Sequence, residues 1–240
     1  MTHVPIEATI ERCWREVATI EEAFEAGEID REGWHRRIAS LVVPAYLAGE
    51  DPRAQSGFEG TGADWEHARG LVAEAISRPG TFLDVGCANG LLMESVRAWC
   101  GQRGLSIEPF GVEISPQLAA LARQRLPQWA DRMFEGNAAG WSAPLRFDFV
   151  RTGLEYVPRS LAPALLEHLL STAVHPRGRL LIGPYTEERD QTRSALSVQD
   201  TLRAWGFEPA GTLSRTHERD DRVVRRLTWI GGRARIPDLA

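Results

Sequence analysis

The sequence contains no lysine, and all 28 of its basic residues are arginine. This absence excludes mechanisms that need a lysine side chain, such as a Schiff base, a pyridoxal phosphate anchor or a P-loop. Cysteine is also scarce. Cys13, Cys87 and Cys100 are scattered without a C-x-x-C pair, which predicts neither a disulfide framework nor a metal site.

Long apolar runs are missing as well. No stretch of about 18 apolar residues occurs, and the first residues lack the apolar core of a signal peptide. Together with the few cysteines, this predicts a cytoplasmic protein without a membrane segment. The formal net charge of -5 argues against nucleic acid as the main partner.

The composition is that of an ordinary globular protein, with 43% hydrophobic and 25% charged residues over 240 positions. Such a length suits one domain, or one domain with an appendage. It is also sufficient for a full hydrophobic core.

The N-terminal part is predicted to be helical. Residues 5–26 carry apolar side chains at helical spacing, and Gly27 ends this segment. A second helix is expected to begin with Asp30 as its N-cap and to kink or end at Pro44. A glycine-rich stretch, residues 49–63, then follows. The apolar residues of the first helix are Ile6, Ile10, Trp14, Val17, Ile20 and Phe24.

We therefore divide the chain into an N-terminal helical unit, residues 1–60, and a main domain, residues 61–240. The helical unit is expected to form a cap or lid over a binding site, with the glycines of residues 49–63 as hinges. Its apolar faces need a partner surface. The alternatives are that it adds to the core or mediates a homodimer.

Strands and helices alternate from residue 64 onward, which predicts a parallel sheet with helices on both faces. Near the C-terminus, "FEPAGTLSRTH" and "RVVRRLTWI" are joined only by "ERDD", so these two strands should pair antiparallel. The expected fold is α/β, a doubly wound sheet of seven strands with the last strand antiparallel. The apolar strands are Thr81–Val85, Phe110–Ile114, Met133–Glu135, Phe147–Arg151 and Arg179–Ile182.

The segment "TFLDVGCANGLLMESV", residues 81–96, contains the main motif. A strand ending near Asp84, a glycine loop and a helix together form a nucleotide-binding geometry. The dinucleotide fingerprint would place its third glycine at Leu91, whereas here Gly90 comes one residue earlier. The loop reads D-x-G-x-A-x-G and is not a pyrophosphate loop.

This loop resembles motif I of the class I S-adenosylmethionine-dependent methyltransferases, which have a Rossmann-like fold. The resemblance covers roughly residues 64–230 and continues in order through "FGVEIS", "FEGNAAGW", "RFDFVRTGLEYVP" and "VHPRGRLLIG". It implies S-adenosyl-L-methionine as methyl donor and S-adenosyl-L-homocysteine as product. The implied donor-binding residues are Asp84, Gly86, Cys87, Ala88, Gly90, Glu113, Ile114, Asn137, Ala138 and Thr152.

Within this set, the resemblance places Glu113 on the ribose hydroxyls and Asn137 with Ala138 beside the adenine. The alternatives are a strand-end carboxylate for Glu113 and a turn former for Asn137. Cys87 is more typical of a small packed residue than of a nucleophile. We expect Ala88 at negative φ, because alanine avoids positive φ.

Methyl transfer requires a nucleophile in line with the sulfonium, and a hydroxyl nucleophile also needs a base. The catalytic candidates are Glu155 and Tyr156 after the fourth strand and Tyr185 after the fifth, because ligands bind at these strand ends. The alternatives are a loop acid for Glu155 and pocket walls for both tyrosines. There are three further candidates: His67 or His217 as a base, and Phe58 as a residue that closes over the donor. For each of them the alternative is a simple surface position.

The family resemblance also bears on the acceptor class, because "LEYVP" resembles the corresponding loop of bacterial small-molecule methyltransferases. The loop after the fourth strand has neither an (Asp/Asn)-Pro-Pro-aromatic motif nor a cysteine, and no RNA-binding module is appended. This favours a small-molecule acceptor methylated at O, N or C. The alternatives are an RNA or protein methyltransferase and a non-catalytic protein that binds the donor or a partner.

Overall fold

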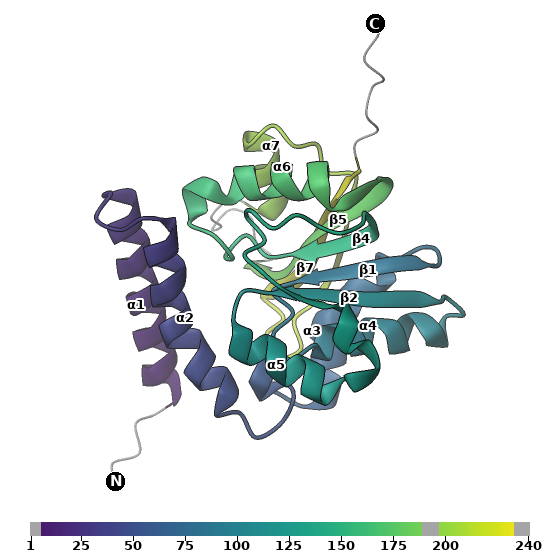
Figure 1. Cartoon of the computed structure of the whole chain (residues 1–240), viewed down its shortest axis with the longest axis horizontal. Helices are drawn as coiled ribbons and strands as arrows, with labels where there is room; N and C mark the ends of the chain where they lie inside the picture. Colours follow the sequence, from purple (N-terminus) through teal and green to yellow (C-terminus); the bar gives the residue numbers. More distant parts are fainter. Residues whose placement is uncertain (1–5, 189–196, 233–240) are drawn as a thin grey trace, which may run out of the picture.

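The computed structural model describes residues 6–188 and 197–232. It contains one seven-stranded sheet in the order β3-β2-β1-β4-β5-β7-β6, with helices on both faces (Figure 1). The sheet confirms the expected α/β fold. The strands are β1 (Gly80–Val85), β2 (Ile107–Glu113), β3 (Met133–Glu135), β4 (Phe147–Thr152), β5 (Val174–Glu188), β6 (Gly211–Thr216) and β7 (Val223–Gly231).

Neighbouring strands from β3 to β5 are parallel, whereas β7 pairs antiparallel with both β5 and β6. The antiparallel last strand was therefore predicted correctly. The cause is the short connection between β6 and β7, which leaves no room for the crossover that a parallel pair requires. In the central strands, Phe82, Leu83, Phe149 and Val150 are fully or almost fully buried, as expected for a sheet covered on both faces.

Two apolar layers hold the helices to the sheet. On one face, the leucines of α6 pack with Phe147 and Ile182. On the other face, Leu71 and Ile76 from the α3 region pack with Phe82. The helices of this domain are α3 (Gly62–Glu74), α4 (Leu91–Gln102), α5 (Pro116–Arg125), α6 (Ala162–Thr172) and α7 (Val198–Ala204).

The N-terminal unit consists of two helices, α1 (Ile6–Glu25) and α2 (Arg31–Leu47), which lie side by side next to the sheet domain (Figure 1). Asp30 caps α2 as predicted, and its carboxylate accepts a hydrogen bond from Gly33 N at 2.7 Å. Of the two outcomes predicted for Pro44, a kink or the end of the helix, the end does not occur, because α2 continues to Leu47. Pro44 and Ser40 are both exposed, so water can reach the carbonyl that loses its helical partner.

Residues 49–63 are more ordered than their glycine content indicates. They include a short 3-10 helix, η1 (Ala54–Ser56), and the Asn89 side chain donates to the Pro52 carbonyl at 2.8 Å. Phe58 is buried and packs edge-on against Trp65, with ring centroids 5.2 Å apart. This segment is therefore anchored to both the motif I loop and α3.

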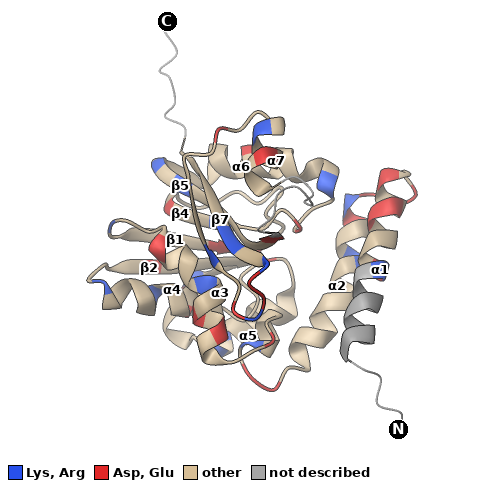
Figure 2. Cartoon of the chain, turned by 180° about the vertical axis from the view of Figure 1, so that it is seen from behind, with Lys and Arg blue, Asp and Glu red and all other residues tan. Residues whose placement is uncertain are grey.

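None of the helices in the described ranges is long and apolar enough to cross a membrane. Figure 2 shows the positions of acidic and basic residues interspersed along the ribbon rather than separated by sign. The arginines of β7 illustrate this pattern: Arg225 pairs with Glu218 and Arg226 pairs with Glu187. The basic C-terminal strand is thus largely neutralised by neighbouring carboxylates.

Candidate functional site

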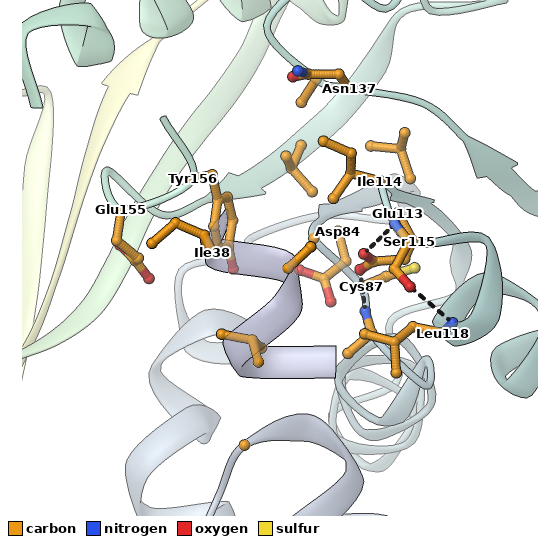
Figure 3. A pocket seen from close by; sticks show the side chains of 18 of the residues that line it. Ile38, Asp84, Cys87, Glu113, Ile114, Ser115, Leu118, Asn137, Glu155 and Tyr156 are labelled. Atoms are coloured by element: carbon orange, nitrogen blue, oxygen red, sulfur yellow. Dashed lines mark hydrogen bonds between the residues drawn. The ribbon is translucent and has the colours of Figure 1, made fainter. Parts of the chain in front are cut away.

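A pocket with a volume of about 310 Å³ opens at the carboxyl ends of β1, β2 and β4. Loops after β1 to β4 form one wall, and α2 forms the opposite wall. Figure 3 shows Glu155 and Tyr156 on one side, Glu113 and Ser115 on the other, and Asp84 between them. The predicted site residues that line it are Asp84, Gly86, Cys87, Ala88, Glu113, Ile114, Asn137, Ala138, Glu155 and Tyr156.

Three predicted site residues do not belong to this lining. Gly90 has φ +76° at the N-cap of α4, and a Cβ there would meet Leu126 at 2.9 Å. Thr152 is fully buried, and its hydroxyl donates to the Gly153 carbonyl at 3.2 Å. Tyr185 lies behind Glu155, to which its hydroxyl donates at 2.5 Å. These residues support the pocket from behind instead of facing it.

The motif I loop adopts left-handed conformations at three alternating positions. Gly86 has φ +68°, Ala88 has φ +46° and Gly90 has φ +76°. The prediction of negative φ for Ala88 is therefore wrong. A left-handed alanine costs about 1–2 kcal/mol, but the conformation directs Ala88 N toward a carboxylate oxygen of Glu113 at 2.9 Å. A hydrogen bond to a charged group contributes about 1.5–3 kcal/mol and offsets that strain.

Glu113 is fixed by two backbone groups. One carboxylate oxygen accepts from Ala88 N and the other from Ser115 N, both at 2.9 Å. The side chain is 5% exposed, and burial raises the pKa of Glu113 although these hydrogen bonds oppose the shift. Each oxygen retains a second lone pair. A pair of neighbouring hydroxyls is the group that such a carboxylate suits.

The turn after β3 forms the far end of the pocket. The side-chain Oδ1 of Asn137 accepts from Ala139 N at 3.0 Å, so the turn-forming alternative for Asn137 holds in the structure. Its amide nitrogen lies 3.4 Å from Nδ1 of His35. Ile114 is 43% exposed toward this part of the pocket. An apolar surface beside a polar turn suits a flat heterocycle.

A buried ion pair lies beneath the centre of the pocket. Asp84 and Arg151 approach to 3.5 Å, with side-chain exposures of 2% and 8%. Arg151 also donates to the Gly183 carbonyl at 2.8 Å and to the Tyr156 hydroxyl at 2.5 Å. Burial raises the pKa of Asp84 to about 7, although the charges of Arg151 and Arg69 oppose the shift.

The loop after β4 carries the remaining acid of the pocket. Glu155 folds over Gly153, where an added Cβ would lie 2.5 Å from its carboxylate. The Tyr185 hydroxyl donates to Glu155 and accepts from Leu154 N, both at 2.5 Å. Burial raises the pKa of Tyr185 well above its usual range. Tyr185 therefore stays protonated and holds Glu155 in place.

The other candidates from the sequence make contacts outside the pocket lining. His67 lies 2.7 Å from the Thr216 carbonyl, and His217 lies 3.6 Å from the Glu218 carboxylate. Neither histidine belongs to the pocket lining found in the described residues. Phe58 packs on Trp65 instead of covering the pocket. Burial raises the pKa of the Cys87 thiol well above its usual range, which agrees with a packed residue and not a nucleophile.

The sequence reasoning missed two contributions to the pocket. One is the inner face of α2. The other is Arg69 of α3, whose guanidinium lies 5.7 Å over the Trp65 ring and has no hydrogen bond or ion pair within the described residues. Burial lowers the pKa of Arg69. In the sequence, the only indication of the Arg69 position was its spacing of one helical turn after Trp65. The α2 residues of the lining are Trp34, His35, Ile38, Ala39, Val42, Val43 and Tyr46.

By sequence, no protein-family model and no curated protein matches the chain. Solved structures do match. The N-methyltransferase NodS from Bradyrhizobium japonicum, in complex with S-adenosylhomocysteine, is 14% identical with a TM-score of 0.57, over 81% of this chain and 98% of NodS. The Burkholderia thailandensis 1,6-didemethyltoxoflavin-N1-methyltransferase, with its acceptor and S-adenosylhomocysteine bound, is 17% identical with a TM-score of 0.57, over 86% and 92% of the two chains.

A third match is magnesium protoporphyrin IX methyltransferase from Synechocystis, at 18% identity and a TM-score of 0.50, over 80% and 96% of the two chains. At this level of identity the likeness establishes the fold alone. The chain therefore has the fold of the class I S-adenosylmethionine-dependent methyltransferases, and its activity must be argued from its own pocket.

Proposed function

We propose that this protein transfers a methyl group from S-adenosyl-L-methionine to an O, N or C atom of a small-molecule acceptor and releases S-adenosyl-L-homocysteine. One observation carries the proposal: the Glu113 carboxylate is held by Ala88 N and Ser115 N at the carboxyl edge of a methyltransferase-type sheet. A buried carboxylate with free lone pairs beside a glycine loop is a receptor for a ribose diol. The NodS and toxoflavin enzymes, which share the fold, contain S-adenosylhomocysteine.

The donor would lie along the carboxyl edge of the sheet. Its adenine fits between Ile114 and the Asn137–Ala138 turn, and its ribose lies on Glu113. The methionine part then extends past Gly86 toward Arg69. An arginine that faces the pocket without an anionic partner among the described residues supports a carboxylate at this end.

The acceptor would enter between the methionine part and α2. This side of the pocket is lined by the apolar residues Ile38, Ala39 and Val42 and by Glu155 with Tyr156. We assign Glu155 as the proton acceptor for an O–H or N–H nucleophile, because it faces the pocket and is fixed by Tyr185. Tyr156 forms the wall over Gly86, where an added Cβ would lie 2.9 Å from its ring.

Two features support a small acceptor over a macromolecule. The α2 helix closes one side of the pocket, which limits the size of the acceptor and excludes water from the sulfonium. Two arginines of β7 are paired with Glu218 and Glu187, and basic and acidic positions are interspersed along the ribbon (Figure 2). We therefore propose residues 1–60 as a cap over the acceptor side.

The test is donor binding measured by calorimetry with S-adenosylhomocysteine. Glu113→Gln is expected to weaken binding about tenfold or more, because it loses hydrogen bonds to a charged group. Glu108→Gln is the matched control, since Glu108 is an exposed carboxylate on the same strand. Equal affinities of the two folded variants would refute the ribose assignment, and binding of NADH instead would refute the family.

Catalysis is tested separately from binding. Purified protein is incubated with S-adenosylmethionine carrying a labelled methyl group and with pools of small hydroxyl, amine and carboxyl compounds. Transfer of label to a small molecule is the expected result. Tight donor binding with no transfer to any pool, but transfer to RNA or protein, would replace the small-molecule acceptor with a macromolecular one.

A further inference from the structure

His35 connects the cap to the two ends of the pocket. It lies on α2, lines the pocket, and places Nε2 3.1 Å from the main-chain carbonyl of Tyr156. The same ring lies 3.4–3.5 Å from the amide nitrogen of Asn137. A single cap residue thus reaches both the loop that carries Glu155 and the turn proposed for the adenine.

The second ring nitrogen of His35 also faces a carbonyl oxygen. Nδ1 lies 2.7 Å from the carbonyl of Arg31, one turn earlier in α2. A neutral imidazole carries one N–H and one lone pair, so it can donate to only one of these two oxygens. The Asn137 amide nitrogen is itself a donor and lies within 3.5 Å of both ring nitrogens, so it can donate to the ring lone pair. The contact between Nε2 and the Tyr156 carbonyl is the one that joins α2 to the loop after β4.

The contact with Tyr156 continues into the floor of the pocket. The Tyr156 hydroxyl accepts from Arg151 at 2.5 Å, and Arg151 lies 3.5 Å from Asp84. Elsewhere the cap is fixed to this loop by Glu21, which accepts from Arg159 N at 2.6 Å. Beyond His35 along α2, Ile38 and Val42 face the pocket and are only partly buried. Closure of α2 over a ligand thus depends on few polar contacts.

We propose that His35 is a positioning residue that latches the cap onto the post-β4 loop by donating from Nε2 to the Tyr156 carbonyl, and that donor binding to the closed pocket weakens when this contact is lost. The proposal rests on the proposed function, because it assumes that the donor occupies the pocket beneath α2. The latch holds the loop bearing Glu155 in place and does not itself contact the reacting atoms.

The experiment measures S-adenosylhomocysteine affinity of the full chain by calorimetry. His35→Leu removes the ring donor and should bind about tenfold more weakly than wild type. His35→Gln keeps an amide N–H group that can donate to the Tyr156 carbonyl, so its affinity should lie between those of wild type and His35→Leu. Arg37→Ala, an exposed change on the same helix, should behave as wild type.

Hydrogen exchange gives a second readout. In the complex with S-adenosylhomocysteine, the amides of residues 154–157 should exchange faster in His35→Leu and His35→Gln than in Arg37→Ala. The latch is refuted if His35→Leu binds as tightly as wild type, or if the amides of residues 154–157 exchange equally fast in His35→Leu and Arg37→Ala. If wild type binds neither S-adenosylhomocysteine nor S-adenosylmethionine, the proposed function fails and the latch fails with it.

Discussion

The carboxylate of Glu113 accepts a hydrogen bond from the backbone N–H of Ala88 at 2.9 Å, and Ala88 is held in the left-handed region at φ +46°. The two residues are 25 positions apart and come from adjacent strand ends. The loop that would hold the methyl donor is therefore stabilised by the residue assigned to the ribose. Strain at a binding loop persists when surrounding contacts determine the conformation, as they do here.

Replacement of Ala88 by glycine should stabilise the protein without donor, because glycine adopts φ +46° without a Cβ penalty. The gain is expected to be about 0.5–1 kcal/mol, since the greater freedom of glycine in the unfolded chain cancels part of the relief. Chemical denaturation measures it. Ala98→Gly is the control: this exposed position in α4 should lose about 1 kcal/mol. A loss of stability in both variants would contradict the strain at Ala88.

Much of the fold could be predicted because its signals are local. The strand before Asp84, the glycines after it and the helix that follows are each dictated by neighbouring residues. The antiparallel β7 follows from a connection too short for a crossover. The φ of Ala88 was missed because intrinsic preference favours negative φ, and a side chain 25 positions away reverses that preference.

The cap side of the pocket was harder to predict for a different reason. Ile38 and Val42 have the spacing of any helix that packs on a core, and the sequence does not tell a core from a cavity. The same limit applies to Arg69, because an arginine on a helix face is usually solvated. His35 was missed because its partners, Tyr156 and Asn137, are more than 100 positions away.

Arg69 should recognise the carboxylate of the donor. Arg69→Leu is expected to weaken S-adenosylhomocysteine binding about tenfold or more, because a charge-assisted contact is lost. Binding of 5′-methylthioadenosine, which has no amino acid part, should change little. Arg97→Leu is the matched control, because Arg97 stacks on Trp129 outside the pocket lining. If Arg69→Leu weakens both ligands equally, its role is structural support of the pocket.

Asp84 should make the preference for donor over product depend on pH. Its folded-state pKa of about 7 lies above the unfolded value of 3.8, so its contribution to stability is present at low pH and is lost as pH rises through about 7. The ionised form appears over the same range and attracts the positive sulfonium of the donor. The ratio of donor to product affinity should therefore rise about threefold or more from about pH 6 to about pH 8.

The product serves as the internal control in this measurement, because it shares every group with the donor except the charged methyl sulfonium. Effects of pH on the adenine, ribose and amino acid contacts cancel in the ratio, and so does any effect on the cap. Calorimetry of both ligands in the same buffers gives the ratio directly. A constant or falling ratio would show that Asp84 is already ionised below pH 6 or lies too far from the sulfonium.

The moving part of the cap should be α2 and not the glycine-rich stretch before α3. Residues 49–63 contain several glycines, as the hinges of a moving lid often do. However, the Asn89 side chain donates a hydrogen bond to the Pro52 carbonyl, and the buried Phe58 ring packs on Trp65. The inner face of α2 instead meets a pocket, and its closure over ligand would bury that face. On addition of S-adenosylhomocysteine, hydrogen exchange should therefore slow more in residues 34–43 than in residues 50–58.

Asn89→Ala tests the anchor of residues 50–58. In the free protein, this variant should speed hydrogen exchange in residues 50–58 while leaving exchange in α1 unchanged. Stronger protection of residues 50–58 than of α2 in wild type would identify that loop as the lid, and protection of the motif I loop alone would make the helical unit a scaffold.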